Sequence, residues 1–350
     1  AMKDVYFSPD KSYVVCFFSK EKNHFYQSHA ELERQKDRLK EIVGNKWQGI
    51  FNSAGGDYWK NVFCWPDGLV EYNGLLGITA PTYKKQFFFE HGSKNNDFLG
   101  IKGKEKEGKW FASANNQNRF LDEKEKGNWS NYLRICILIS RAVRRMHAAG
   151  LAHSDLSYKN ILIDTVTGLA CVIDVDGLVV PGKYPPDVVG TPDFIAPEVV
   201  KTNHFKRDDP QRNLPNIMTD RHALAVLIYM YLLYRHPLRG GKVHDVNDPQ
   251  RDENLAMGEN ALFIGHPTDQ SNRVKVSQVR PSALPWADPE KIPFTVTGPY
   301  LKELFLQSFV TGLHQPQERP SANDWETALV KTVDLIQPCL NSDCGQKWYV

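Results

Sequence analysis

A long helical pattern, followed by a polar loop and two short apolar strands, is the feature that most limits how this chain can fold. Residues 128–151, NWSNYLRICILISRAVRRMHAAGL, show the spacing of a helix, and Gly150 marks its end. Two strands, NILID (160–164) and ACVID (170–174), follow and are joined by the turn TVTG. The loop between helix and strand, AHSDLSYKN, carries a His, an Asp and an Asn. We therefore take this loop as the first candidate for a site of chemistry.

The amino-terminal quarter of the chain predicts a small α+β lobe. YVVCFF (13–18) has the β-branched and aromatic residues of a strand, and residues 28–43 have the charge-rich pattern of a mostly exposed helix. Three more strand-like segments follow, VFCWP (62–66), LVEY (69–72) and LLGITAP (75–81).

The rest of the chain predicts a larger, mainly helical lobe. Residues 91–127 are polar, and the mixed charges of KGKEKEGK (102–109) indicate a solvated loop. The apolar run ALAVLIYMYLLY (223–234) is too short to span a bilayer and indicates a buried helix. Later segments are mostly helical and are separated by loops rich in Pro and Gly.

The composition is that of an ordinary folded protein, and it excludes several classes of function. The chain has 350 residues, of which 41% are hydrophobic and 24% charged, enough for a sizeable core. A net charge of +2 argues against nucleic acid or an anionic membrane as the main partner. Residues 1–12 contain no apolar signal region, and the six scattered cysteines indicate free thiols rather than disulfides. We therefore expect a cytoplasmic protein.

The polar loop has the residue types that phosphoryl transfer requires. Asp155 could accept the proton of a substrate hydroxyl, and Asn160, five residues later, could reach a metal ion from the same loop. The alternative is an exposed polar loop without chemistry. The helix before the loop and the strand after it favour a phosphoryl-transfer site, in which His153 braces the loop rather than transferring a proton.

The segment VIDVDG (172–177) adds a second polar group to that site. Asp174 stands at the end of a paired strand, where its carboxylate would point out of the sheet edge towards a bound metal ion. The same residues could form a hairpin or an Asx turn. Because Mg²⁺ prefers a few oxygen ligands together with substrate phosphates, Asp174 and Asn160 suit this ion.

With GTPDFIAPE (190–198) added, the chain resembles the protein-kinase superfamily. The three segments follow the order and spacing of the catalytic loop, the metal-binding element and the end of the activation segment. The resemblance implies an α+β, bilobal protein-kinase-like fold. Its small β-rich N-lobe would cover residues 1–83, without a recognisable Gly-rich loop, and its larger, mainly helical C-lobe would cover residues 84–338.

The same resemblance implies cofactors and catalytic residues. The cofactors would be ATP and Mg²⁺, with Asn160 and Asp174 as metal ligands. Asp155 would orient or deprotonate the acceptor hydroxyl, while Thr191 would steady Asp155 and Lys159.

Two further contacts follow from the resemblance. Asp220 would tie down the catalytic loop from the start of a buried helix, and Arg319 would pair with Glu198 of the A-P-E segment. Small-molecule kinases usually lack that segment and its Arg partner. A small-molecule phosphotransferase is therefore the third alternative, behind a protein kinase and a pseudokinase scaffold.

The catalytic loop departs from the common kinase pattern in two places. Ser154 stands where an Arg usually pairs with an activation-segment phosphate, and between residues 177 and 190 only Tyr184 offers a hydroxyl. We therefore expect an active conformation that does not depend on phosphorylation of that segment. Ser157 stands where Ser/Thr kinases carry a Lys, so Lys159 is left to neutralise the developing charge. The loop itself leaves the hydroxyl specificity open.

The N-lobe departs further, because the usual strand Lys is missing. In YVVCFF the expected Lys position falls on Phe18. Lys20 is the first alternative, Lys3 is the second, and the site could also lack an equivalent. Glu31 or Glu33 would be the helix partner of such a Lys.

The adenine site would lie at the junction of the lobes, in GITAPTY (77–83). There, backbone groups of four consecutive residues would contact the base: Ala80, Pro81, Thr82 and Tyr83.

Longer matching segments, HAAGLAHSDLSYKN, IDVDGLVVPG and GTPDFIAPEVV among them, resemble the kinase-like proteins of bacterial tellurite-resistance operons. That resemblance implies a Ser/Thr protein kinase in a stress-related phosphorylation system. It also implies a TerY-type von Willebrand-factor-A protein and a metal-dependent protein phosphatase as partners.

The tail, residues 339–350, contains Cys339 and Cys344 five residues apart and resembles half of a zinc ribbon. Two cysteines alone cannot complete a four-ligand zinc site within one chain, and two inert thiols are the alternative.

Overall fold

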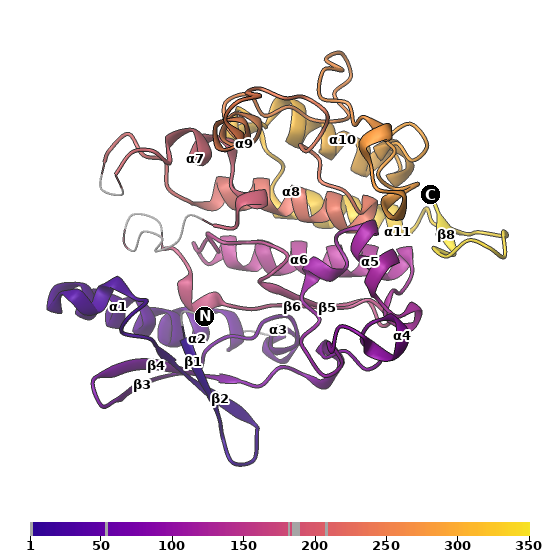
Figure 1. Cartoon of the computed structure of the whole chain (residues 1–350). Helices are drawn as coiled ribbons and strands as arrows, with labels where there is room; N and C mark the ends of the chain where they lie inside the picture. Colours follow the sequence, from indigo (N-terminus) through magenta and orange to yellow (C-terminus); the bar gives the residue numbers. More distant parts are fainter. Residues whose placement is uncertain (1–2, 53–54, 181–182, 184–189, 207–208) are drawn as a thin grey trace.

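The amino-terminal part of the chain forms a four-stranded antiparallel sheet. The computed structural model describes residues 3–52, 55–180, 183, 190–206 and 209–350. The strands pair in the order β1-β2-β4-β3 (Figure 1). Their bounds are β1 (Lys3–Phe7), β2 (Tyr13–Phe18), β3 (Gly68–Tyr72) and β4 (Leu75–Pro81). Their β-branched and aromatic residues suit a pleated, half-buried surface, and the strands predicted at 13–18, 69–72 and 75–81 are confirmed.

Helix α1 (His29–Glu41) packs against this sheet. Leu39 on the helix contacts a small apolar cluster that includes Phe18 and Leu76 of the sheet. The opposite, charged face of the helix lies in solvent, as its sequence predicts. A π-helical turn then leads into α2 (Trp47–Phe51).

The strand predicted at VFCWP is wrong. Helix α3 (Gly56–Val62) takes the first residue of that segment, and Phe63 makes only an isolated bridge to Val172. Trp65 is buried and donates its indole N–H to the carbonyl of Ile42 at 3.0 Å. These aromatic residues join the large core of the helical region, because the small sheet cannot cover that much apolar surface. The division of the chain into lobes at residue 83 stays a prediction.

Three helices form the centre of the larger part of the fold: α6 (Trp129–Ala148), α8 (Ile217–Leu233) and α11 (Ala322–Val333). Helix α6 contacts both α8 and α11 (Figure 1). Helix α8 is buried over most of its length, which confirms the buried helix predicted from its apolar run. Its start is fixed by a capping box between Asn216 and Thr219. The other helices are α4 (Lys94–Asp97), α5 (Ala114–Phe120), α7 (Pro197–Thr202), α9 (Pro249–Met257) and α10 (Pro299–Leu306).

A two-stranded hairpin brings the polar loop and the DVDG segment together. Strands β5 (Ile161–Asp164) and β6 (Leu169–Val172) pair antiparallel, with Ile161 opposite Val172. Asn160 precedes β5 and Asp174 follows β6, so both residues lie at the same end of the hairpin. The backbone N–H of Ile173 donates to the carbonyl of Asn160 at 3.0 Å, which extends the pairing by one step.

The prediction of a solvated loop at KGKEKEGK is wrong for one of its residues, Lys106. The ammonium group of Lys106 lies 3.0 Å from a carboxylate oxygen of Glu125 and 3.1 Å from one of Asp164. All three side chains are buried. The run of mixed charge concealed this cluster because its other charged residues do face solvent.

The expected α+β class, with a small antiparallel sheet and a larger helical region, is confirmed. Among the described residues, no helix is both long enough and apolar enough to cross a membrane.

Candidate active site

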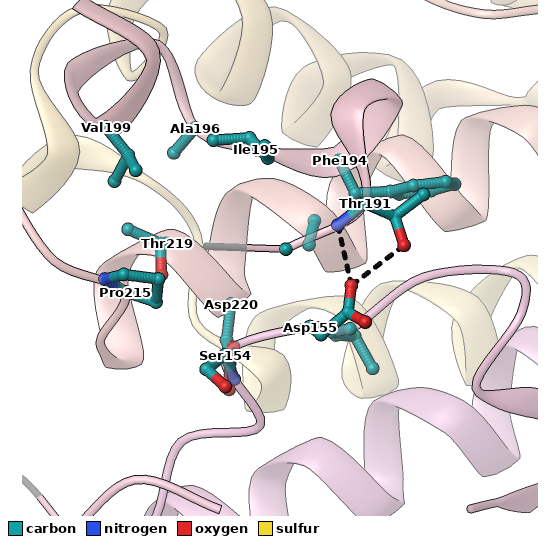
Figure 2. A pocket seen from close by; sticks show the side chains of 13 residues that line it. Ser154, Asp155, Thr191, Phe194, Ile195, Ala196, Val199, Pro215, Thr219 and Asp220 are labelled. Atoms are coloured by element: carbon teal, nitrogen blue, oxygen red, sulfur yellow. Dashed lines mark hydrogen bonds between the residues drawn. The ribbon is translucent and has the colours of Figure 1, made fainter. Parts of the chain in front are cut away.

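Asp155 is oriented by residues on both sides of it. One carboxylate oxygen accepts the backbone N–H of Thr191 at 2.7 Å and its hydroxyl at 2.9 Å (Figure 2). The other oxygen accepts the side-chain amide of Asn160 at 3.0 Å, and that amide also donates to the backbone carbonyl of Asp155 at 2.8 Å. Residues from the catalytic loop and the activation segment therefore fix the direction of this carboxylate.

Thr191 does not make the expected contact with Lys159. The hydroxyl oxygens of Thr191 and Ser157 share a hydrogen bond at 3.2 Å, whereas no hydrogen bond joins Thr191 to Lys159. Lys159 is exposed, and its ammonium group makes no hydrogen bond or ion pair with a described residue. Ser157 is buried and fills the place beside Thr191, so the expected contact between Thr191 and Lys159 is corrected to Thr191 and Ser157.

The catalytic loop is fastened from behind by Asp220. This buried residue lies in the first turn of α8, and its carboxylate accepts the backbone N–H groups of His153 at 2.7 Å and of Ser154 at 3.1 Å. Ser154 has a φ of +66°, a strained conformation that these bonds stabilise. His153 is buried, and its Nε2 lies 3.1 Å from the carbonyl of Ile173. The His153 side chain therefore connects the loop to the backbone directly after β6.

Asp174 stands beside a second carboxylate and one cation. The ammonium of Lys3 lies 2.7 Å from a carboxylate oxygen of Asp174 and 2.7 Å from one of Asp176. Burial alone would lower the pKa of Lys3, but the two carboxylates outweigh it and raise that pKa. Burial alone would raise the pKa of Asp174, yet the charge of Lys3 holds it below its usual value. Lys3 and Asp174 are therefore both ionised at neutral pH.

The structure brings Lys3, and not Lys20, to Asp174. Lys3 opens strand β1 opposite Phe18, the position where the sequence lacks its Lys. Lys20 is exposed, and its ammonium lies 6.0 Å from the centre of the Tyr26 ring.

The expected helix partners, Glu31 and Glu33, do not contact Lys3. Glu33 pairs with Lys36 at 3.1 Å, and Glu31 is exposed. The partners of Lys3 come instead from the DVDG loop.

Helix α1 reaches the DVDG loop through Arg38, which the sequence analysis does not identify. Its Nε donates to the carbonyl of Leu178 at 3.2 Å, and its Nη2 donates to the carbonyl of Gly177. Arg38 is buried although it belongs to a helix rich in charge. This contact ties α1 to the residues directly after Asp176. No sequence signal distinguishes Arg38 from the exposed cations beside it, whereas Asp176 could have been found as the second Asp of DVDG.

The four predicted adenine-site residues lie at the end of strand β4 and directly after it. Ala80 and Pro81 belong to β4 and pair with β2. The N–H of Thr82 donates to the carbonyl of Ser12 at 3.2 Å, so this amide is not available to a base. Tyr83 packs beside Phe87, and burial raises the pKa of its phenol.

The end of the activation segment is locked to the helical region. Glu198 accepts two hydrogen bonds from Arg319, at 2.8 and 2.7 Å. The guanidinium of Arg319 is buried, and it also donates to the backbone carbonyls of Gly312 and Leu313. Tyr184 lies outside the described residues.

Two cavities adjoin the catalytic loop. The smaller one has a volume of about 10 Å³, and Asp155, Thr191 and Asp220 line it (Figure 2). It has room for about one water molecule. The larger one has a volume of about 550 Å³, and Tyr158 of the loop and Asp193 of the activation segment form part of its wall.

The chain was also compared with known proteins. The family model described as protein kinase domain matches residues 107–347, which is more than half of the chain. No curated protein matches the chain. The match includes the catalytic loop, the DVDG segment and the Glu198–Arg319 lock. The chain therefore belongs to the protein kinase domain family.

Proposed function

We propose that this chain is an ATP-dependent protein kinase, which transfers the γ-phosphate of ATP to a hydroxyl group of a protein acceptor. The observation that carries the proposal is the orientation of Asp155 by Thr191 and Asn160 in front of the Asp220 anchor. Such an arrangement is unnecessary for an exposed loop, but it suits a base whose direction matters.

The residues present fit a bound Mg²⁺ ion. The carboxylate of Asp174 and the side-chain oxygen of Asn160 are the hard oxygen donors that this ion prefers. Asn160 precedes β5 and Asp174 follows β6, so both donors lie at the same end of one hairpin. When bound, Mg²⁺ would neutralise charge on the phosphates of ATP.

Asp155 and Lys3 would act on the reaction directly. Asp155 accepts the proton of the acceptor hydroxyl. The oxygen of that hydroxyl forms a bond to the γ-phosphorus, while the bond between the γ-phosphorus and the leaving ADP oxygen breaks. Lys3 supplies the cation that the usual strand Lys supplies elsewhere. Thr191 and Ser157 hold the base in place, and the exposed Lys159 is free to meet phosphate or acceptor. Within the adenine site, Ala80, Pro81 and Tyr83 remain proposed contacts.

The larger cavity gives an acceptor protein a place to bind. Its volume of about 550 Å³ accommodates side chains of an extended segment, and Tyr158 and Asp193 connect it to the catalytic loop and the activation segment. The phenol of Tyr158 lies 3.3 Å from a carboxylate oxygen of Asp193, which Arg239 also holds. This wall is fixed by side-chain contacts, as a specific binding site requires.

The finer assignment is a Ser/Thr kinase of a bacterial tellurite-resistance type of phosphorylation system. It rests on the resemblance of the catalytic and activation segments alone. A TerY-type von Willebrand-factor-A protein and a metal-dependent phosphatase would be its partners. The proposed units are an N-lobe (1–83), a C-lobe (84–338) and a Cys-containing tail (339–350).

A pseudokinase scaffold is the second candidate, because Lys3 already occupies both carboxylates of the DVDG loop. Incubation with γ-labelled ATP, Mg²⁺ and a generic protein acceptor tests both candidates. Labelled protein should appear with the native chain and with Asp57→Asn, a control variant in which an exposed carboxylate is replaced. No labelled protein should appear with Asp155→Asn. Absence of label with a nucleotide-induced rise in melting temperature would favour the pseudokinase instead.

A further inference from the structure

The segment that begins at Asp174 is fastened at both of its ends. At the start, the ammonium of Lys3 lies 2.7 Å from carboxylate oxygens of Asp174 and Asp176. At the other end, Val179 exchanges two backbone hydrogen bonds with Ala152, at 2.8 and 3.0 Å, directly before the HSD residues of the catalytic loop. The position of this segment therefore depends on both the four-stranded sheet and the start of the catalytic loop.

Arg38 of helix α1 holds the middle of the same segment. Its Nε donates to the carbonyl of Leu178 at 3.2 Å, and its Nη2 donates to the carbonyl of Gly177. A guanidinium presents its N–H donors in a rigid fork, so two bonds to consecutive carbonyls fix the direction of the backbone as well as its place. The bond to Leu178 is buried, and losing it would leave a buried carbonyl without this donor.

The backbone that carries Arg38 is itself held in place. Ile42, one helical turn later, is fully buried, and its carbonyl accepts the indole N–H of Trp65 at 3.0 Å. After a further turn, the ammonium of Lys46 donates to the carbonyl of Ala149 at 2.8 Å, directly after the end of α6. The guanidinium therefore reaches the DVDG loop from a fixed point.

Asp174 has a backbone conformation that needs support from its surroundings. Its φ of +60° lies in the left-handed region, which costs free energy for a residue with a side chain. A 3₁₀ turn (Val175–Gly177) follows, and the N–H of Leu178 donates to the carbonyl of Val175 at 3.3 Å. Arg38 binds the last residue of this turn and the residue after it. One turn of backbone thus connects the guanidinium to the Asp174 carboxylate.

We propose that Arg38 is a positioning residue for the binding of Mg²⁺ with nucleotide. Through the carbonyls of Gly177 and Leu178, it sets the direction of the Asp174 carboxylate. The inference rests on the proposed function, because that function makes Mg²⁺ and ATP the ligands of this site. Residues that orient a metal ligand through hydrogen bonds typically contribute about 10- to 100-fold to metal affinity or activity.

Calorimetric titration with ADP, without Mg²⁺ and with saturating Mg²⁺, tests this role without requiring catalysis. We expect Mg²⁺ to tighten ADP binding to the native chain. Arg38→Met keeps the apolar stem but removes the donors, so it should weaken ADP binding in the presence of Mg²⁺ by about 10- to 100-fold and leave Mg²⁺-free binding unchanged. Arg38→Lys, whose ammonium can donate to the same carbonyls, should recover part of this loss. Arg34→Met, at an exposed position of the same helix, should bind ADP as the native chain does.

Hydrogen exchange separates positioning from general stability. In Arg38→Met, the backbone amides of residues 172–180 should exchange faster, whereas those of α8 should keep their native protection. If Arg38→Met does not fold, Arg38→Lys alone should still show a weaker response to Mg²⁺ than the native chain.

Four results would overturn the proposal: a native response to Mg²⁺ in Arg38→Met, an Arg38→Lys variant as weak as Arg38→Met, equally faster exchange in α8, or ADP binding by the native chain that does not depend on Mg²⁺. Label transfer from ATP is measured separately. Absence of transfer by the native chain, together with the expected ADP results, would reject the proposed kinase activity and still support the role of Arg38.

Discussion

Replacing Lys3 by Met tests whether Lys3 binds ATP or has only a structural role. Met keeps the length and apolar stem of the side chain and removes the ammonium that lies 2.7 Å from both Asp174 and Asp176. Two carboxylates would then face each other without a cation. Both the free energy of unfolding and the kcat/KM for ATP should then fall, and the two effects can be measured separately.

The stability change should be modest because the ion pairs are only partly buried. The side chains of Lys3, Asp174 and Asp176 are 20%, 49% and 10% exposed. Fully exposed pairs contribute about 0–1 kcal/mol, and breaking a buried pair costs about 3–5 kcal/mol. We therefore expect a loss of about 2 kcal/mol in the free energy of unfolding, which leaves an ordinary domain folded. Because Lys3 holds the pKa of Asp174 below its usual value, the contribution of this pair is present at neutral pH and should fade as acid protonates Asp174.

The activity change should be larger than stability can explain. Removing a positioned group that stabilises transition-state charge costs about 100- to 1000-fold in rate. We expect a fall of that size in kcat/KM for ATP, measured by label transfer at a temperature where urea titration shows the variant folded. Lys20→Met is the matched control and should retain native kinetics. Native kinetics in Lys3→Met, or a fall in Lys20→Met instead, would refute the assignment of Lys3.

Three further predictions concern buried polar groups. Glu198→Gln should lower the free energy of unfolding by about 2–3 kcal/mol, because the 1% exposed side chain of Arg319 loses its carboxylate; urea titration checks this, and no change would contradict it. Lys106→Met should cost about 4 kcal/mol in the same assay, because it leaves two buried carboxylates facing each other, whereas exposed Lys60→Met should cost less than about 1 kcal/mol. Burial lowers the pKa of His222 well below its usual value. Below about pH 6.5, His222 therefore binds a proton in the unfolded chain but stays neutral in the folded chain. Stability should therefore fall with pH below 6.5, and His222→Phe should reduce that slope by about 1.4 kcal/mol per pH unit; an unchanged slope would exclude His222 as a source.

The sequence predicts the parts of the candidate site that lie close together along the chain. Asp155 and Asn160 share the loop before β5, and Asp174 follows β6, which pairs with β5, so hairpin geometry alone brings them together. The long apolar run that becomes α8 was predictable for the same reason, because burial follows from a local pattern. The strand prediction for VFCWP was wrong because its apolar residues fit a strand and a buried helix end equally well.

Other parts of the site depend on contacts between distant segments. Lys3 and Asp174 are 171 residues apart, and Arg38 is 140 residues from the carbonyl of Leu178 that it binds. From the sequence alone, a Lys or Arg within a charged segment is interpreted as exposed to solvent, because its tertiary contacts are not visible there. The buried Lys106 was not predicted for the same reason. The sequence by itself therefore determined the order of the elements and the catalytic loop, because local spacing sets both. Only the tertiary structure decided which lysine meets Asp174 and which charges are buried, because packing brings those groups together across the whole chain.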